Sequence, residues 1–221
     1  YPFWMFTTPA GFGKKKVCLS AGIHGDEPAG IEAIIAFMEG LKQNTPFLEK
    51  YQFTLFPCIN PFGYEFDLRE NGEKADLNRQ FNQTSPSREV YLLKQGIEGE
   101  SFDLFYEFHE DKDSKGFYLY ELSAEVPVLG EKIIERVREC CPINDDRLIE
   151  EMPSKGGVIY TSFETLGFWE RITQIGGWPQ AIFFAKRGTP VCITAETPVH
   201  IEMPKRVNTH LTAFETALRL I

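Results

Sequence analysis

Short apolar runs alternate with longer amphipathic segments along most of the chain. Five runs rich in branched and aromatic residues predict buried strands, at residues 17–21, 51–59, 102–108, 117–122 and 190–195. Four segments repeat apolar residues at spacings of three and four and predict helices, at residues 28–42, 87–97, 127–140 and 205–221. Strands that alternate with helices favour a mostly parallel sheet with helices on both faces. The pattern therefore predicts a single α/β domain over residues 1–221 with a mixed, mostly parallel central sheet.

The first predicted helix shows the pattern most clearly. Pro28 marks its start, because proline suits a helical turn in which the backbone N–H lacks a partner anyway. One apolar face is then formed by Ile31, Ile34, Ile35, Met38 and Leu41. Residues 142–180 show no such period, since proline, glycine and tryptophan interrupt them, and they support no assignment.

Charge and cysteine content narrow the class of protein. The 221 residues include 32 acidic and 23 basic side chains, a formal net charge of −9, which argues against a positively charged nucleic-acid groove. The five cysteines are odd in number and lack CxxC spacing, so neither a disulfide framework nor a cysteine zinc site is expected. No apolar run approaches the roughly 18 residues of a membrane span, and no signal peptide is visible. We expect a protein of the reducing cytoplasm with no membrane partner.

The most specific chemical signal follows the first predicted strand. His24 and Glu27 stand three residues apart where this strand gives way to the helix that begins at Pro28. Open α/β sheets build their sites at such strand ends, and an imidazole and a carboxylate on one tight turn can face a single ion. Nitrogen and oxygen ligands together suit Zn²⁺. Alternatively, both side chains simply cap the helix, whose positive end a carboxylate stabilises.

A catalytic zinc site needs a third protein ligand and an open position. The chain has four histidines, and His109 follows the strand predicted at 102–108, the same topological position as that of His24. His200 and His210 lie in or beside the C-terminal segment and are expected at the surface. His109 alone could equally be a core histidine, but with His24 and Glu27 it completes a His₂Glu set.

A further carboxylate, Glu196, ends the strand predicted at 190–195. At this position it could accept a proton from a metal-activated water and pass it to a leaving amine. The alternative is an ordinary solvated glutamate in a loop.

The order of these pieces resembles the zinc carboxypeptidase family and the related succinylglutamate desuccinylase and aspartoacylase enzymes. Six pieces between residues 17 and 198 carry the resemblance: His24-Gly25-Asp26-Glu27, Asn60-Pro61-Phe62-Gly63-Tyr64, Arg69, Asp76-Leu77-Asn78-Arg79, His109 and Glu196. Each piece alone is a weak signal, whereas the set in this order is specific. The resemblance implies a carboxypeptidase-like α/β fold. It also implies one Zn²⁺ per chain, held by His24, Glu27 and His109, with Glu196 as the general base.

The same resemblance assigns the polar residues between the ligands. Arg69 would polarise the scissile carbonyl, and Asn78 and Arg79 would bind the carboxylate of the substrate. These roles suit the residue types, because a planar guanidinium binds a carboxylate bidentately and a cation beside zinc stabilises developing negative charge. Asp76 could orient Arg79 or a metal ligand.

One feature departs from the family pattern. In many relatives small or hydroxylic residues follow the third ligand, whereas here Glu110 and Asp111 follow it. The added negative charge would disfavour acidic substrates or create a second cation position.

Larger carboxypeptidases also place a tyrosine from a mobile loop over the substrate. Tyr160 is the predicted counterpart, because Gly156 and Gly157 before it permit motion. Tyr118 and Tyr120 compete for this role and are instead expected to pack in the core.

The predicted function is zinc-dependent hydrolysis of an amide bond next to a free carboxylate, in a peptide or a cell-wall peptide. The chain ends one predicted helix after Glu196, without the C-terminal β-domain of aspartoacylases, which favours a peptidase over a deacylase. Deacylation of N-acyl amino acids is the first alternative, and a non-catalytic scaffold that binds metal or peptide is the second. The expected partner is a small peptide or acyl-amino-acid substrate, and the oligomeric state is left open.

Overall fold

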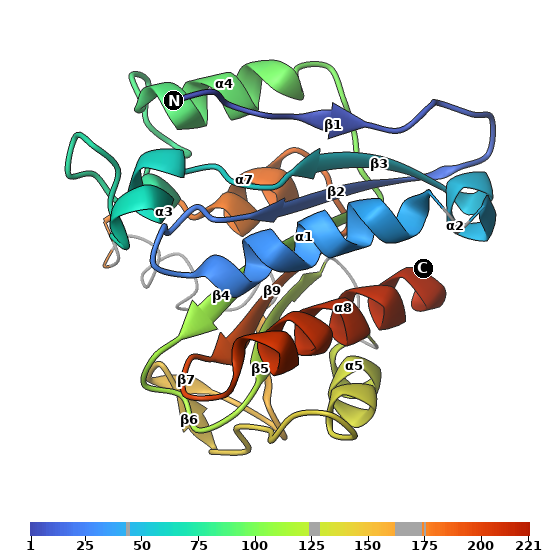
Figure 1. The fold of residues 1–221 in the computed structure, drawn as a ribbon, viewed down its shortest axis with the longest axis vertical. Helices are drawn as coiled ribbons and strands as arrows, with labels where there is room; N and C mark the ends of the chain where they lie inside the picture. Colours follow the sequence, from blue (N-terminus) through green and yellow to red (C-terminus); the bar gives the residue numbers. More distant parts are fainter. Residues whose placement is uncertain (43–44, 124–128, 162–173, 175) are drawn as a thin grey trace.

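A seven-stranded sheet runs through the centre of the computed structural model (Figure 1). The structure describes residues 1–42, 45–123, 129–161, 174 and 176–221. In chain order the strands are β1 (Phe6–Thr7), β2 (Lys15–Ala21), β3 (Tyr51–Phe56), β4 (Leu104–Asp111), β5 (Tyr118–Ser123), β6 (Leu148–Ile149), β7 (Met152–Pro153), β8 (Val158–Thr161) and β9 (Val191–Pro198). The strand order in the sheet is β1-β3-β2-β4-β9-β5-β8, and β6 and β7 pair separately.

The sheet is mixed and mostly parallel. β3, β2, β4 and β9 pair in parallel with one another in that order, and β5 pairs in parallel with β8. The antiparallel pairs are β1 with β3 and β5 with β9. The predicted fold class, a single α/β domain with a mixed, mostly parallel sheet, is confirmed.

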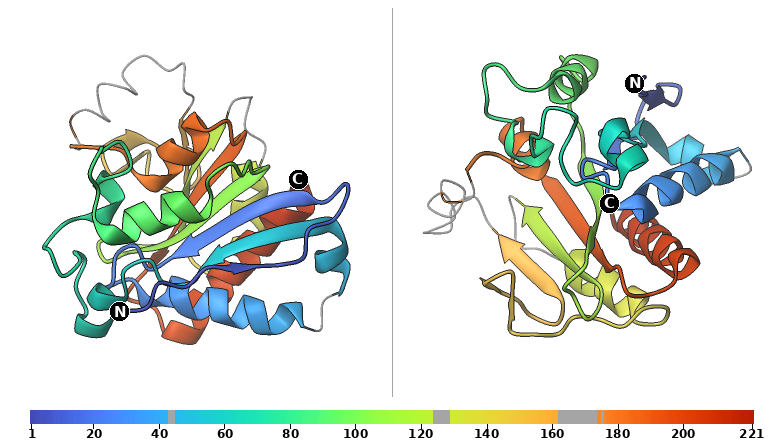
Figure 2. Two further views of the ribbon diagram at one scale, coloured as in Figure 1. Left: turned by 90° about the horizontal axis from the view of Figure 1, so that it is seen from above. Right: turned by 60° about the vertical axis from the view of Figure 1, so that its left-hand side comes forward.

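Helices cover both faces of this sheet (Figure 2). They are α1 (Pro28–Leu41), α2 (Thr45–Lys50), α3 (Pro61–Phe66), α4 (Arg88–Gly96), α5 (Leu129–Val137), α7 (Gln180–Lys186), α8 (Met203–Leu220) and a 3₁₀ turn, η1 (Leu77–Arg79). One hydrophobic core lies between the sheet and α1, α5 and α8, and a second lies between the sheet and α4 and α7. Across the described residues, no helix is both long enough and apolar enough to cross a membrane.

The helix predicted at 28–42 forms, but its buried face is rotated. Ile31, Ile34, Phe37 and Leu41 are buried, whereas Ile35 is 43% exposed. Phe37 replaces Ile35 because its ring packs edge-on against Phe53 of β3 and Phe214 of α8. The start predicted for the third helix, at residue 127, lies outside the described residues.

Two strands extend beyond their predicted ends. β4 continues to Asp111 and β9 to Pro198, because the two strands pair in register up to these residues. His109 and Glu196 therefore lie within the paired part of the sheet and are register partners of each other. Among the helices, the sequence pattern did not predict α2, α3 or α7.

Candidate metal centre

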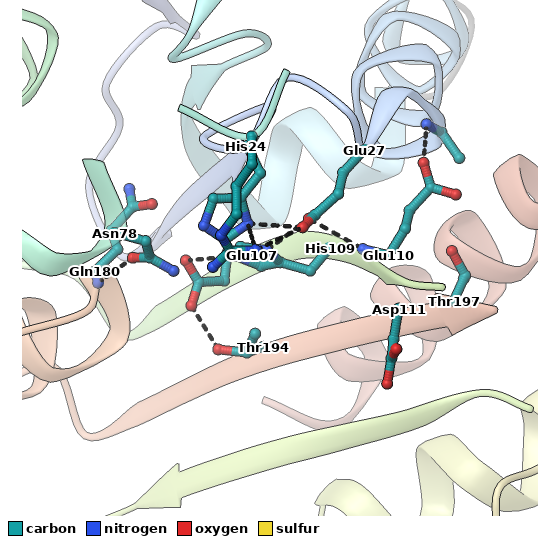
Figure 3. Close-up of polar contacts among 12 residues, drawn as sticks. His24, Glu27, Asn78, Glu107, His109, Glu110, Asp111, Gln180, Thr194 and Thr197 are labelled. Atoms are coloured by element: carbon teal, nitrogen blue, oxygen red, sulfur yellow. Dashed lines mark hydrogen bonds and ion pairs between the residues drawn. The ribbon is translucent and has the colours of Figure 1, made fainter. Parts of the chain in front are cut away.

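Three potential metal ligands converge at the carboxyl edge of the parallel strands (Figure 3). His24 and Glu27 lie in the turn from β2 to α1, and His109 lies on β4, the neighbour of β2. Nδ1 of His24 is 2.7 Å from Glu27 Oε1, and Nδ1 of His109 is 2.7 Å from Glu27 Oε2. Potential ligand atoms of all three residues lie within 4.8 Å of one another, and each residue is at most 6% exposed.

The turn that carries His24 is tied to the loop that follows β3. The backbone N–H of Gly25 donates to the carbonyl of Leu68 at 3.0 Å. A Cβ at Gly25 would lie 1.9 Å from the carbonyl carbon of Gly63, so only glycine permits this approach. Asn60 braces the same loop, because its Oδ1 accepts from the Gly63 N–H and its Nδ2 donates to the Arg69 carbonyl. The Asn-Pro-Phe-Gly-Tyr motif therefore fixes the position of the turn that carries His24 and Glu27 relative to Arg69.

Charge couples the three side chains. Burial would raise the pKa of Glu27, but the two histidines outweigh this and hold its pKa well below the usual range. Burial would likewise lower the pKa of His109, yet the Glu27 carboxylate outweighs it and raises that pKa well above the usual range. The arrangement thus favours an ionised Glu27 beside cationic charge.

These residues fit a zinc ion by their chemistry. Both imidazoles turn the same ring nitrogen, Nδ1, toward the shared carboxylate. Two nitrogen ligands and one carboxylate form the His₂Glu set that catalytic zinc sites use, with a further position left for water. The structure therefore brings together the three residues that the sequence analysis selected.

Carboxylates also lie behind both imidazoles. Nε2 of His24 is 3.3 Å from Asp76 Oδ1, and Nε2 of His109 is 3.5 Å from Glu107 Oε2. Glu107 is 2% exposed, and its other oxygen accepts from the Thr194 hydroxyl at 2.5 Å. A carboxylate on the far nitrogen fixes the tautomer and orientation of a metal-binding imidazole. The sequence analysis missed Glu107 and Thr194, although each stands two residues before a selected residue and so shares its strand face.

Arg69 points toward the ligands from the loop after α3. Its Nη1 is 3.6 Å from Glu27 Oε1, and its Nε and Nη2 lie 3.3 and 3.1 Å from Asp76 Oδ2. Burial would raise the pKa of Asp76, but His24, Arg69 and Arg79 hold it well below the usual range. Asp76 therefore stays ionised and holds both Arg69 and His24 in place.

Asn78 and Arg79 lie on η1 and line the same cavity as His24, Glu27 and His109. The Oδ1 of Asn78 accepts from the N–H of Gln180, the first residue of α7, at 2.7 Å. Arg79 donates to the Asn78 carbonyl at 2.8 Å. The unpredicted helix α7 thus anchors Asn78 and indirectly Arg79.

Glu196 faces the metal set from β9, as the register partner of His109 on β4. Among the residues that the structure describes, none makes a hydrogen bond to its carboxylate. Burial raises the pKa of Glu196 well above the usual range, and the charge of His109 only partly opposes this.

One cavity of about 460 Å³ unites most of the predicted site. Seven of the eight selected residues line it: His24, Glu27, Arg69, Asn78, Arg79, His109 and Glu196. The same cavity is also lined by the acidic residues Asp111, Asp113 and Glu150.

The eighth selected residue, Tyr160, is not among the described residues that line this cavity. Tyr160 lies on β8 next to Thr161, which does line the cavity. Successive side chains on a strand point to opposite faces, so Tyr160 points away. Tyr118 and Tyr120 on β5 pack in a small hydrophobic cluster with Ile149 and Ile159, as expected, and they also line the cavity, opposite Glu196 and Thr194.

The two acidic residues after His109 are held by protein donors. Glu110 pairs with Arg206 and accepts from the Ala29 N–H, and Asp111 accepts from the Tyr118 hydroxyl at 2.9 Å. Within the described parts of the chain, His24, Glu27 and His109 form the one group of three metal-ligating side chains. A second cation position at Glu110 and Asp111 therefore receives no support.

His210 is not at the surface, contrary to expectation. It is completely buried on α8, where its ring packs 4.5 Å from the Phe108 ring and its Nε2 lies 3.0 Å from the Thr197 hydroxyl. His210 precedes the buried Phe214 and Leu218 at spacings of four, a signal that the sequence analysis did not use. His200 is exposed, as expected.

Comparison with known proteins places the chain in a family. A sequence profile of the succinylglutamate desuccinylase/aspartoacylase catalytic domain matches residues 13–133, more than half of the chain. The chain belongs to this family. The predicted resemblance is thereby confirmed.

The curated relatives include the murein peptide amidase A of Escherichia coli strain K12. It is 32% identical to the chain over 117 residues, a match that covers 45% of this chain and 46% of the amidase. The chain thus spans about half the length of the curated relatives that it matches.

Solved structures share the fold over nearly the whole chain. A Shewanella denitrificans protein, proposed to be a metallopeptidase, matches with a TM-score of 0.82 at 22% identity, over 98% of this chain and 78% of that protein. A metallo-carboxypeptidase of Pseudomonas aeruginosa matches with a TM-score of 0.70 at 17% identity, over 98% of this chain and 60% of its own. These likenesses confirm the predicted carboxypeptidase-like fold.

Proposed function

We propose that this protein is a zinc-dependent hydrolase that cleaves an amide bond next to a free carboxylate, with a peptide of the cell-wall type as the leading substrate. The observation that carries the proposal is the register of Glu196 with His109. It brings a carboxylate into the same cavity as the His24–Glu27–His109 set. The relationship to an E. coli murein peptide amidase supports the substrate class.

Glu196 moves the proton in this proposal. When bound, zinc supplies a Lewis acid that activates water at neutral pH and polarises a carbonyl. Glu196 accepts a proton from the attacking water and delivers it to the leaving amine. Burial raises the pKa of Glu196 above that of an ordinary carboxyl group, which makes it a stronger proton acceptor than a solvated glutamate.

Arg69 and η1 orient the substrate. The Arg69 guanidinium, held by Asp76, lies 3.6 Å from Glu27 and stabilises the negative charge that develops on the carbonyl oxygen. Asn78 and Arg79, which line the cavity, bind the free carboxylate of the substrate, for which the planar guanidinium is well suited.

Deacylation of an N-acyl amino acid is the second candidate function. It is favoured by the match to the succinylglutamate desuccinylase/aspartoacylase catalytic domain and would use the same residues. N-acetylaspartate and N-succinylglutamate, assayed beside short peptides and cell-wall peptides with a free carboxylate, separate the two candidates.

Zinc content and turnover test the proposal together. Elemental analysis should find about one zinc per wild-type chain, the single ion that a His₂Glu site holds, and none in the His24→Ala, His109→Ala double variant. Glu196→Gln should keep its zinc and lose roughly 10²–10⁴-fold in turnover, whereas Glu215→Gln on the exposed surface of α8 should retain wild-type turnover. Wild type that binds no zinc after reconstitution would remove the metal chemistry. An active Glu196→Gln variant would remove Glu196 from its role.

A further inference from the structure

Glu110 links strand β4 to helices α1 and α8 beside the proposed metal ligands. It follows His109 on β4, and its side chain is completely buried. Its Oε2 accepts from the Ala29 N–H in the first turn of α1 at 2.7 Å, and its Oε1 contacts Arg206 of α8. Its own backbone N–H donates to Glu27 Oε2 at 3.1 Å. Figure 3 shows the Glu110 side chain directed away from the Glu27 carboxylate and toward α1.

The start of α1 explains why such a residue is needed. The first N–H groups of a helix lack partners within the helix, and the side chain of the N-cap residue usually accepts from one of them. Here the N-cap residue is Glu27, and its side chain makes no capping hydrogen bond within the described structure. Its two oxygens are instead directed at the imidazoles of His24 and His109. Glu110 supplies the missing acceptor from a different strand.

We propose that Glu110 is a positioning residue for the metal ligand Glu27. By capping α1 from β4, it releases the Glu27 carboxylate from the capping role and makes it available to a metal ion. Two hydrogen bonds hold the segment from Glu27 to Ala29 against the strand that carries His109. The Glu110 N–H donates to Glu27 at one end, and the Ala29 N–H donates to Glu110 at the other. The inference rests on the proposed metal site. It adds the contacts that align the segment of Glu27 with the strand of His109.

Arg206 is the charge partner of the buried Glu110 carboxylate. A buried carboxylate without a charge partner is strongly unfavourable, and Arg206, whose side chain is 12% exposed, provides that partner from α8. Arg206 therefore offsets part of the cost of burying the carboxylate that caps α1.

The test compares metal affinity with stability in four variants. They are Glu110→Ala, Glu110→Gln combined with Arg206→Met, Arg206→Met alone, and Glu215→Gln as a control whose ion pair with Arg219 is exposed. Zinc dissociation constants are measured by competition with a chromophoric chelator. Thermal unfolding and hydrogen exchange of the Ala29 amide are measured on the metal-free proteins.

Glu110→Ala should bind zinc roughly 10–100-fold more weakly, the effect typical of residues that orient metal ligands, and its Ala29 amide should exchange faster. The Glu110→Gln, Arg206→Met double variant keeps an acceptor for Ala29 and removes both buried charges, so its zinc affinity should exceed that of Glu110→Ala. Arg206→Met alone leaves the Glu110 carboxylate buried and unpaired, and should bind zinc more weakly than the double variant. Glu215→Gln should match wild type.

Zinc affinity of Glu110→Ala within about twofold of wild type, with a lowered melting temperature, would show a structural role only and overturn the proposal. If Glu110→Ala fails to fold, the test is made with the double variant. The proposal is also overturned if the double variant binds zinc no more tightly than Arg206→Met alone. Wild type that binds no zinc would instead contradict the proposed function, and this role with it.

Discussion

Mild acid should destabilise this protein through His210. The imidazole is completely buried between Phe108 and Thr197, and its Nδ1 has no hydrogen-bond partner in the described structure. Burial, with a smaller contribution from His109, lowers the pKa of His210 to about 3. The folded protein therefore keeps this histidine neutral at a pH where an unfolded chain would protonate it.

The size of the effect follows from proton linkage. An unfolded histidine has a pKa of about 6.5, so below that pH the unfolded chain binds a proton that the folded protein does not. The stability is fully present above the unfolded pKa and is lost as the pH falls toward the folded value of about 3. Between about pH 7.5 and pH 5 this residue alone should remove about 2 kcal/mol from the free energy of unfolding.

Urea unfolding of the metal-free protein at both pH values measures this loss. His210→Phe keeps an aromatic ring beside Phe108 and leaves the Thr197 hydroxyl unpaired equally at both pH values, so it should lose about 2 kcal/mol less than wild type on acidification. Other titrating groups, including His109, are common to both proteins and cancel in the difference. His200→Phe, at an exposed position, should behave as wild type. Equal losses in wild type and His210→Phe would refute the reasoning.

Two further substitutions test how the ligands are held. Gly25→Ala should weaken zinc binding by about tenfold or more, because its Cβ would lie 1.9 Å from the carbonyl carbon of Gly63. Gly40→Ala, which meets no atom within 4 Å, is the control, and equal zinc affinity in the two variants would contradict the argument. Glu107→Gln removes the charge behind His109 Nε2 and should weaken zinc binding roughly 10–100-fold; unchanged affinity in a chelator competition would show that Glu107 does not orient the ligand.

The grouping of the proposed metal ligands was predictable because the order of the parallel strands brings them together. His24 follows β2 and His109 lies near the end of β4, and the two strands are parallel neighbours. Any residue at the carboxyl end of one such strand lies near the end of the next. The same logic placed Glu196 on β9, although the sequence did not show that it would be the register partner of His109.

Residues whose role depends on where the side chain points in the folded protein were harder to predict. Tyr160 was selected for the glycines before it, but strand alternation turns it away from the cavity. Glu110 was interpreted as charge at the mouth of the site, because its partner Arg206 lies 96 residues further along the chain. Such pairings depend on where α8 packs in the fold. The periodicity of the sequence predicts only that α8 has an apolar face, not which residues that helix contacts.

The position of β9 in the sheet has a consequence for biosynthesis. β9 is the last strand in the chain, yet it lies between β4 and β5, which are both made much earlier. Until residues 191–198 leave the ribosome, β4 and β5 each present an unpaired edge, the kind of surface that promotes aggregation. The proposed metal ligands on β4 and before α1 can meet before then, but Glu196 arrives only with the strand that closes the sheet. The proposed metal set of a nascent chain can therefore form before the proposed general base joins it.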